Sequence, residues 1–260
     1  MLIFLSLISW IAITIYTRRL SASVTAGLEL IPEEPSLGSG NQNLAISPAN
    51  LPTVTIIIPA YNEAENIEDC IQAALDSEQL TVNSEQLTVS QQTEQSLVAV
   101  WVVDDQSTDQ TLQIARSLQQ ELADPRLQIL PGSPRPAGEV WVGKNWACHQ
   151  IAQQLTSDYL LFIDADVQLK PGAIEAAIQK MEREQLDLLT AVPQVICGCW
   201  AEWLVQPMLM QTILIGFNFR QVNDPEHPNV FGAGMFMLFR RSTYEKLGGH
   251  KPSGRRLWKM

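Results

Sequence analysis

Acidic and polar side chains follow short apolar runs at several points of this chain of 260 residues. Asp164 and Asp166 end the run Tyr159–Ile163 with the letters D-A-D. If this segment is extended, both carboxylates point to the same side, because side chains alternate along a strand. Mg²⁺ and Mn²⁺ bind well to one or two carboxylates combined with phosphate oxygens. The three letters alone leave open a divalent-cation site and a solvated turn at a strand end.

Two further clusters have the same character. Asp104 and Asp105 close a second apolar run in V-V-D-D-Q-S-T-D. One carboxylate could accept hydrogen bonds from a base or ribose while the other caps a helix, or both could serve capping and turn formation. The segment Pro59-Ala60-Tyr61-Asn62-Glu63 follows a first run. Tyr61 could face a base and Glu63 a ribose hydroxyl, unless both merely precede a helix.

Lys144 lies in W-V-G-K-N-W-A, near a predicted helix start after a loop rich in Pro and Gly. Exposed backbone N–H groups and an ammonium group both favour binding of an anion there. Lys144 could therefore contact a diphosphate, or it could be an ordinary surface lysine. The chain has no G-x-x-x-x-G-K-[ST], no G-x-G-x-x-G and no G-x-S-x-G. These absences argue against a P-loop, an ordinary dinucleotide site and a serine hydrolase.

The elements that position these residues alternate in hydrophobic period. Strand-like runs at 54–58, 97–103, 127–130 and 159–163 are followed by helical patterns, the first with Asn62 as its predicted N-cap. Such alternation predicts an α/β fold with a mostly parallel sheet covered on both faces. Open sheets of this kind bind ligands at the carboxyl ends of their strands. The three polar clusters therefore converge on one edge.

Composition limits the possible partners. The formal net charge of −11 makes nucleic acid an unsuitable partner, because nucleic-acid binders concentrate Lys and Arg. The four cysteines lack paired metal spacings and occur with only three histidines, which predicts a reducing compartment and no zinc.

The N-terminal part departs from this soluble pattern. Residues 2–16 carry no charge, and Arg18 and Arg19 follow them. Residues 1–19 are therefore predicted to form a membrane anchor helix that keeps the following domain on the cytoplasmic side, with a cleaved signal or a peripheral helix as alternatives. Residues 20–52 have the composition of a flexible linker, and residues 77–95 contain a tandem repeat that predicts a surface-loop insertion.

A second apolar segment covers residues 200–219 and is interrupted by Glu202, Pro207 and Gln211. These interruptions argue against a full membrane crossing. An amphipathic segment on the bilayer surface and a buried core helix both remain open.

Taken in order, I-I-I-P-A-Y-N-E-A-E-N-I, V-V-D-D-Q-S-T-D and Y-L-L-F-I-D-A-D resemble the nucleotide-sugar half of a family 2 glycosyltransferase. The resemblance covers residues 53–249 and implies a three-layer α/β/α domain of the GT-A fold over 53–250, with residues 251–260 as an irregular tail. It also implies an inverting transfer from a UDP-sugar with Mg²⁺ or Mn²⁺. The implied donor-binding residues are Pro59, Tyr61, Glu63, Asp105, Lys144 and Asp164, and the implied metal ligand is Asp166.

Downstream, P-A-G-E-V-W-V-G-K-N-W-A and the segment around F-G-A-G-M are similar to the hopanoid-associated branch of this family, with carotenoid glycosyltransferases nearby. That similarity implies a membrane lipid such as a hopanoid or carotenoid as acceptor. It places Gly232, Ala233 and Gly234 in an acceptor-side loop. A strand with a glycine bulge would explain the same residues.

The chain departs from the family in one respect. The acidic general base of the family follows the G-G element, whereas no carboxylate lies beyond Glu245 here. The expectation is a C-terminally truncated enzyme of uncertain activity. The alternatives are a non-catalytic nucleotide-sugar-binding remnant and a nucleotidyltransferase of similar topology.

Overall fold

The computed structural model describes residues 52–78, 97–141, 143–217, 219–224, 226–229 and 231–251. The predicted anchor, nearly all of the linker, most of the repeat-containing insertion and nearly all of the tail lie outside these residues. Within the described part, residues 52–192 and 233–251 belong to one compact unit and residues 193–232 to another. Each unit is described by itself.

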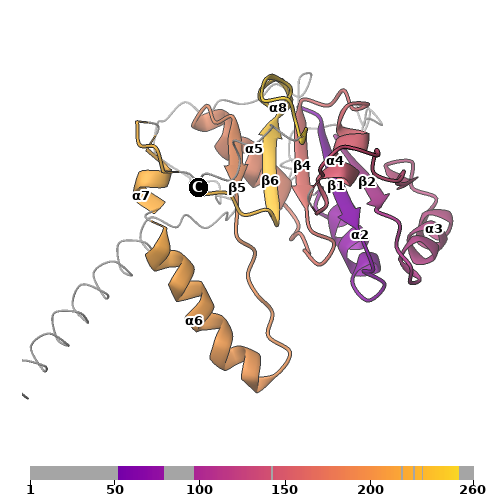
Figure 1. Cartoon of the computed structure of the whole chain (residues 1–260), viewed down its shortest axis with the longest axis horizontal. Helices are drawn as coiled ribbons and strands as arrows, with labels where there is room; N and C mark the ends of the chain where they lie inside the picture. The colour runs from indigo at the N-terminus through magenta and orange to yellow at the C-terminus, as the bar shows by residue number, and fades with distance from the viewer. Residues whose placement is uncertain are drawn as a thin grey trace, which may run out of the picture. The chain divides into compact units, whose positions relative to one another are not determined.

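The first unit is built on a six-stranded sheet of order β3-β2-β1-β4-β6-β5 (Figure 1). Its strands are β1 (Val54–Ala60), β2 (Val98–Asp104), β3 (Leu127–Pro131), β4 (Tyr159–Ile163), β5 (Leu188–Thr190) and β6 (Phe236–Arg240). Strands β1 to β4 run parallel to one another, whereas β6 is antiparallel to both β4 and β5. The predicted mostly parallel sheet is confirmed.

Helices cover both faces of this sheet. One face packs against α2 (Ile67–Asp76), α3 (Thr111–Leu122) and α5 (Ala173–Arg183), with side chains such as Ile56 and Ile58 of β1 in the shared core. The opposite face packs against α4 (Asn145–Ala152) and α8 (Arg241–Lys246), where Ile57 of β1 meets Cys148 and Tyr244. Every residue of β1 and β4 is buried, as their unbroken apolar runs predict. The three-layer α/β/α arrangement follows from these two cores.

Two local predictions were wrong. Asn62 does not cap a helix, because α2 begins five residues later at Ile67. Asn62 instead adopts a positive φ of 56° and uses its side chain to bind the neighbouring loop. The D-A-D segment is not extended either. β4 ends at Ile163, and the backbone N–H of Val167 donates to the carbonyl of Asp164 at 3.1 Å, which closes a turn.

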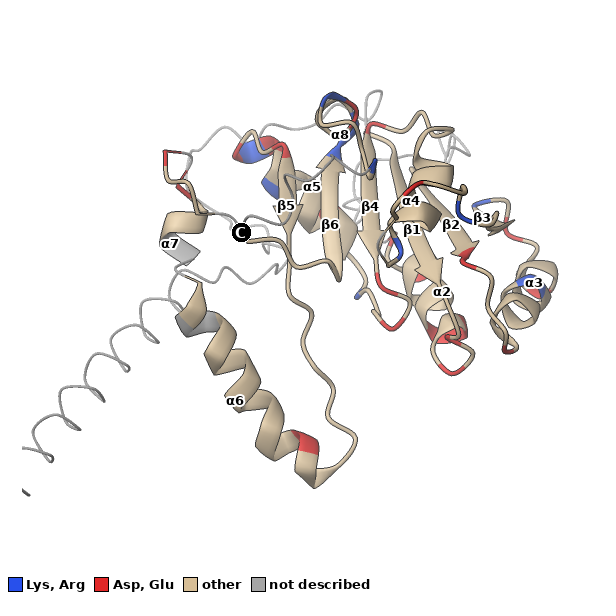
Figure 2. Cartoon of the chain, viewed as in Figure 1, with Lys and Arg blue, Asp and Glu red and all other residues tan. Residues whose placement is uncertain are grey.

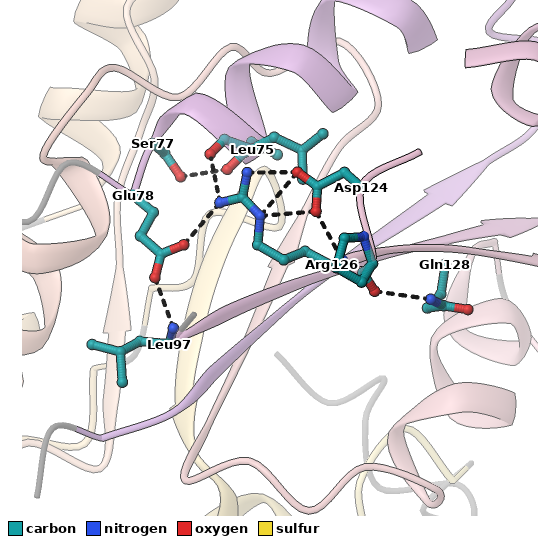
Figure 3. Close-up of polar contacts among 9 residues, drawn as sticks. Leu75, Ser77, Glu78, Leu97, Asp124, Arg126 and Gln128 are labelled. Carbon is teal, nitrogen blue, oxygen red and sulfur yellow. Dashed lines mark hydrogen bonds and ion pairs between the residues drawn. The ribbon is translucent and has the colours of Figure 1, made fainter. Parts of the chain in front are cut away.

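A polar cluster holds the amino ends of β2 and β3 to the end of α2 (Figure 3). The Arg126 guanidinium donates one hydrogen bond to a carboxylate oxygen of Asp124 at 2.7 Å. It donates another to a carboxylate oxygen of Glu78 at 2.8 Å. The other oxygen of Glu78 accepts the backbone N–H of Leu97 at 2.7 Å. Glu78 and Leu97 border the insertion, so its two ends are joined at the edge of the sheet where β2 begins.

The second unit contains α6 (Trp200–Gly216) and the short α7 (Phe219–Val222). α6 has 17 residues and includes Pro207. Among the described residues, no helix combines the length and apolar character needed to cross a membrane.

Candidate nucleotide-sugar site

A pocket of about 600 Å³ opens at the carboxyl ends of β1 and β2. The side chains and backbone around it come from three segments that are distant in sequence: the end of β1, the end of β2 and the loop between β3 and α4. The lining residues are Pro59, Ala60, Tyr61, Asp105, Gln106, Pro134, Arg135, Gly143 and Lys144. Four of the predicted donor residues, Pro59, Tyr61, Asp105 and Lys144, therefore share one pocket.

Hydrogen bonds between the first two loops hold the pocket walls. The Asn62 backbone N–H donates to the Ser107 hydroxyl at 3.0 Å, and the Asn62 side-chain oxygen accepts the Thr108 N–H at 2.8 Å. The Glu63 N–H donates to Thr111 Oγ1 at 2.8 Å. These bonds hold the segment after Tyr61 against the loop after β2, and Tyr61 and Asp105 both line the pocket. Tyr61 is 57% exposed, so its ring is open to a ligand.

The two aspartates that end β2 have separate roles. Asp104 is buried, its carboxylate lies 3.3 Å from the Ser107 N–H, and its carbonyl accepts the Gly132 N–H at 2.8 Å. A Cβ on Gly132 would lie only 2.5 Å from that carbonyl oxygen, so this close approach requires glycine. Asp105 instead lines the pocket. Of the two carboxylates that the sequence left open as ligand contacts, only Asp105 lines this pocket, and its ligand role stays a prediction.

Arg135 is the pocket residue that the motifs missed. Its guanidinium lies 3.1 Å from Asp105 Oδ2 and donates to the Gly143 carbonyl at 3.0 Å. The sequence places Arg135 in an irregular loop rich in Pro and Gly. Because this loop has no hydrophobic period, the sequence does not predict where the Arg135 side chain points, and only the structure identifies it as a pocket residue. The loop is held in turn by Trp146, whose indole N–H donates to the Ser133 carbonyl at 2.7 Å.

Lys144, at the start of α4, connects the end of β4 with the start of β6. Its ammonium forms an ion pair with Asp164 after β4 and donates to the Gly234 carbonyl before β6 at 2.8 Å. Gly234 thus lies beside the donor-side lysine. Ala233 is anchored by Thr190 of β5, whose hydroxyl accepts the Ala233 N–H at 2.8 Å. Gly232 belongs to the second unit, and its position relative to the pocket is not described.

Glu63, Asp164 and Asp166 gather near a buried thiol rather than in the pocket lining. Burial, followed by the negative charges of Asp166, Glu63 and Asp164, raises the pKa of Cys70 to about 12. Asp164 is half-buried, whereas Asp166 is exposed. The described residues hold no group of three or more His, Cys, Asp or Glu side chains arranged around a metal. A metal here would need oxygen ligands from a phosphate and water as well.

Beside α4, the end of α8 brings a histidine into the second core. Tyr244 Oη and His250 Nδ1 lie 2.6 Å apart, and the imidazole meets the Phe162 ring edge-on at 4.7 Å between centroids. Gly249 permits this path, since its φ is 63° and an added Cβ would lie 3.0 Å from the Tyr244 ring. Burial, followed by the nearby His149 and Lys144, lowers the pKa of His250 to about 4.

Comparison with known proteins finds relatives of this chain. Two 4,4'-diaponeurosporenoate glycosyltransferases of Staphylococcus aureus, from strains bovine RF122 / ET3-1 and MRSA252, are 27% and 28% identical over 210 residues, or 80% of this chain. The chain spans 49% of the length of each of these relatives. The hopanoid branch is not represented among these relatives, so that finer expectation is not confirmed.

A solved structure shows the same fold. The mannosyltransferase PcManGT of Pyrobaculum calidifontis, in complex with GDP-Man and Mn²⁺, superposes with a TM-score of 0.58 at 19% identity. The superposition covers 95% of this chain and 57% of that one. Residues 55–248 match the family model of glycosyl transferase family 2, which is most of the described chain. The protein belongs to glycosyl transferase family 2.

Proposed function

We propose that the chain binds a UDP-sugar with Mg²⁺ or Mn²⁺ and transfers the sugar to a membrane lipid such as a carotenoid or hopanoid. The observation that carries the proposal is the pocket in which Tyr61 and Asp105 face Arg135 and Lys144. An aromatic ring and a carboxylate suit a nucleoside, and two cations suit a diphosphate. The family membership and the polar strand ends support the same chemistry.

On this proposal, Tyr61 stacks on the base and the Asp105 carboxylate accepts the N3–H of uracil. Pro59 shapes the wall of the pocket at the end of β1. Glu63 and Asp164 hold hydroxyl groups of the ribose or the sugar. Lys144 leaves its ion pair with Asp164 when a diphosphate offers a stronger anion, because a phosphate carries more negative charge than one carboxylate.

Asp166 would hold the divalent cation. It is exposed at the turn after β4, with Asp164 two residues away, so water and phosphate oxygens have room to complete an oxygen shell. The ion would neutralise the negative charge that develops on the departing diphosphate. The protein contributes the fixed carboxylate, and the turn at Asp164–Val167 orients it.

The acceptor is proposed to approach from the side of Ala233 and Gly234. This loop contacts Lys144, so it lies next to the place where the sugar would be presented. The relatives named for 4,4'-diaponeurosporenoate support an apolar acceptor of the carotenoid type. The predicted N-terminal anchor supports an acceptor in the membrane and a catalytic unit on its cytoplasmic side.

Calorimetric titration of the purified chain tests the donor half. We expect UDP to bind more tightly when Mn²⁺ is present and ADP to bind far more weakly under the same conditions. Incubation with UDP-sugars and a lipid extract, followed by mass spectrometry of the lipids, tests the transfer. Absence of UDP binding with and without Mn²⁺ would overturn the proposal.

A non-catalytic nucleotide-sugar-binding role is the second candidate. The pocket described above would serve this role equally well, because binding a donor requires no group that deprotonates an acceptor. UDP binding without any glycosylated lipid would select this second role. Formation of pyrophosphate from UTP and a sugar phosphate would instead select a nucleotidyltransferase.

A further inference from the structure

The helix α6 exposes large apolar side chains to solvent. Trp200 is 80% exposed, and the residue Ile196 in the segment before the helix is equally exposed. In Figure 2 the ribbon of α6 has a single acidic segment near its N-terminus and no basic segment. The exposed apolar residues of the helix are Trp200, Trp203, Leu204, Val205, Met208 and Leu209.

These side chains do not form a narrow stripe. At 3.6 residues per turn, the six positions spread over roughly 240° of the helix circumference. A helix that packs against a protein core or one partner helix needs a stripe of roughly 100°. A helix that is apolar on most sides needs an apolar phase around it. The sequence left open an amphipathic segment on the bilayer surface and a buried core helix; the apolar part of α6 is wider than the single stripe of an amphipathic helix.

The polar groups on α6 are partly satisfied within the second unit. The Glu202 carboxylate accepts the Gly198 N–H at 2.7 Å, and the Thr212 hydroxyl donates to the Met208 carbonyl at 2.9 Å. Polar groups that already have partners enter a water-poor phase at lower cost than groups without them. Both hydrogen bonds therefore lower the cost of transferring α6 from water into an apolar phase.

We propose that α6, together with Val195 and Ile196, enters one leaflet of a lipid bilayer. Seventeen residues give a helix of about 26 Å, which is shorter than the roughly 20 residues typical of a membrane-spanning helix. Trp200 and Trp203 stand near its N-terminus, and tryptophan prefers the headgroup level. The uncharged residues 2–16, predicted to be a membrane segment, bring the chain to the same bilayer.

This inference deepens the proposed function by naming the surface that meets the membrane of the acceptor. The formal net charge of −11 gives no attraction to anionic lipids, so contact rests on apolar side chains. Binding to zwitterionic phosphatidylcholine is therefore expected to persist in high salt.

Tryptophan quenching in the full chain tests the proposal. The protein is mixed with phosphatidylcholine vesicles whose acyl chains carry bromine, and the quenched fraction of tryptophan emission is measured. The chain has seven tryptophans. We expect the double variant W200F/W203F to show a smaller quenched fraction than the wild type. The control W101F removes a tryptophan from β2 and is expected to show a larger fraction.

Equal quenching of the wild type and W200F/W203F would overturn the proposal, because the lipid contact would then lie elsewhere. A second readout needs no change in α6. Cys197 and Cys199 precede the helix and are accessible, whereas Cys70 and Cys148 are buried thiols whose pKa burial raises to about 12. An environment-sensitive fluorophore therefore labels the first pair, and its emission should shift to the blue when vesicles are added.

A blue-shifted emission without vesicles, accompanied by a concentration-dependent dimer in sedimentation, would assign α6 to a second copy of the chain and overturn the proposal. An emission that vesicles leave unchanged would also overturn it. None of these readouts uses a nucleotide or a sugar. A chain that fails to transfer sugar can therefore still pass this test, and a chain that transfers sugar can fail it.

Discussion

Arg135 and Asp105 form an ion pair of 3.1 Å across the pocket, although 30 residues separate them in the chain. Asp105 follows β2, and Arg135 lies in the loop after β3. The carboxylate proposed to bind a base is thus already paired with a cation. A ligand that binds here must either separate the Asp105 carboxylate from the Arg135 guanidinium or form contacts with both groups.

Replacement of Arg135 by alanine should weaken UDP binding and leave the fold intact. The Arg135 side chain is 46% exposed, so loss of its ion pair should lower the free energy of unfolding by less than about 1 kcal/mol. Loss of a charged hydrogen bond to the ligand should raise the Kd for UDP about tenfold. Calorimetry and thermal melting measure the two effects. Arg116→Ala on the exposed side of α3 is the matched control and should change neither.

Lys144→Met should reduce affinity for UDP more than affinity for uridine, because the ammonium is proposed to bind the diphosphate. A charged contact of this kind changes the Kd about ten- to a hundredfold. Lys144→Arg should retain part of the affinity, since the charge remains but its geometry changes. Lys246→Met, an exposed lysine of α8, serves as the control. Equal losses for UDP and uridine would contradict the assignment.

Asp166→Asn should remove the effect of Mn²⁺ on UDP affinity, because a neutral amide holds a divalent cation poorly. UDP binding measured without metal should change little. Titrations with and without Mn²⁺ give both values. Asp76→Asn, at an exposed position at the end of α2, should behave like the wild type. A variant Asp166→Asn that retains the full Mn²⁺ effect would place the metal elsewhere.

The half-buried His250 should make the free energy of unfolding decrease as the pH falls. Its pKa is about 4 in the folded chain and 6.5 ordinarily, so below pH 6.5 the unfolded chain takes up a proton that the folded chain does not. The contribution of His250 to the free energy of unfolding is fully present above pH 6.5. It decreases by up to about 3 kcal/mol as the pH falls towards 4. Urea unfolding at several pH values measures it. His250→Gln cannot titrate and should show a weaker decline, with the remainder due to His149, whose pKa burial also lowers.

Arg126→Leu should destabilise the first unit without affecting UDP binding. Arg126 pairs with Asp124 and Glu78 at the edge where β2 begins, whereas the pocket lies where β1 and β2 end. Loss of such partly buried charged hydrogen bonds typically costs about 1 to 3 kcal/mol. Urea unfolding and UDP titration measure the two properties. Arg126→Lys should be nearly as unstable, because lysine lacks the planar fork that meets both carboxylates.

Much of the sheet was predictable because its strands are buried on both faces. An unbroken run such as Val54–Ala60 can satisfy its backbone and bury its side chains only in a covered parallel sheet. The polar ends of β1, β2 and β4 then share an edge by topology. The start of α2 was not predictable from Asn62, because its side chain binds Thr108 of another loop instead of the helix start beside it.

The types and order of the residues, through the period of burial and the polar strand ends, were enough to indicate the α/β fold, the family and a polar cluster that includes the pocket residue Asp105. Arg135, the Lys144 contact with Gly234 and the turn that separates Asp164 from Asp166 depend on loop conformation. Buried and exposed residues alternate with the period of a strand or a helix, so the sequence predicts these elements directly. Contacts between loops join distant residues through hydrogen bonds that no local period records, so they exist only once the sheet has brought its strand ends together.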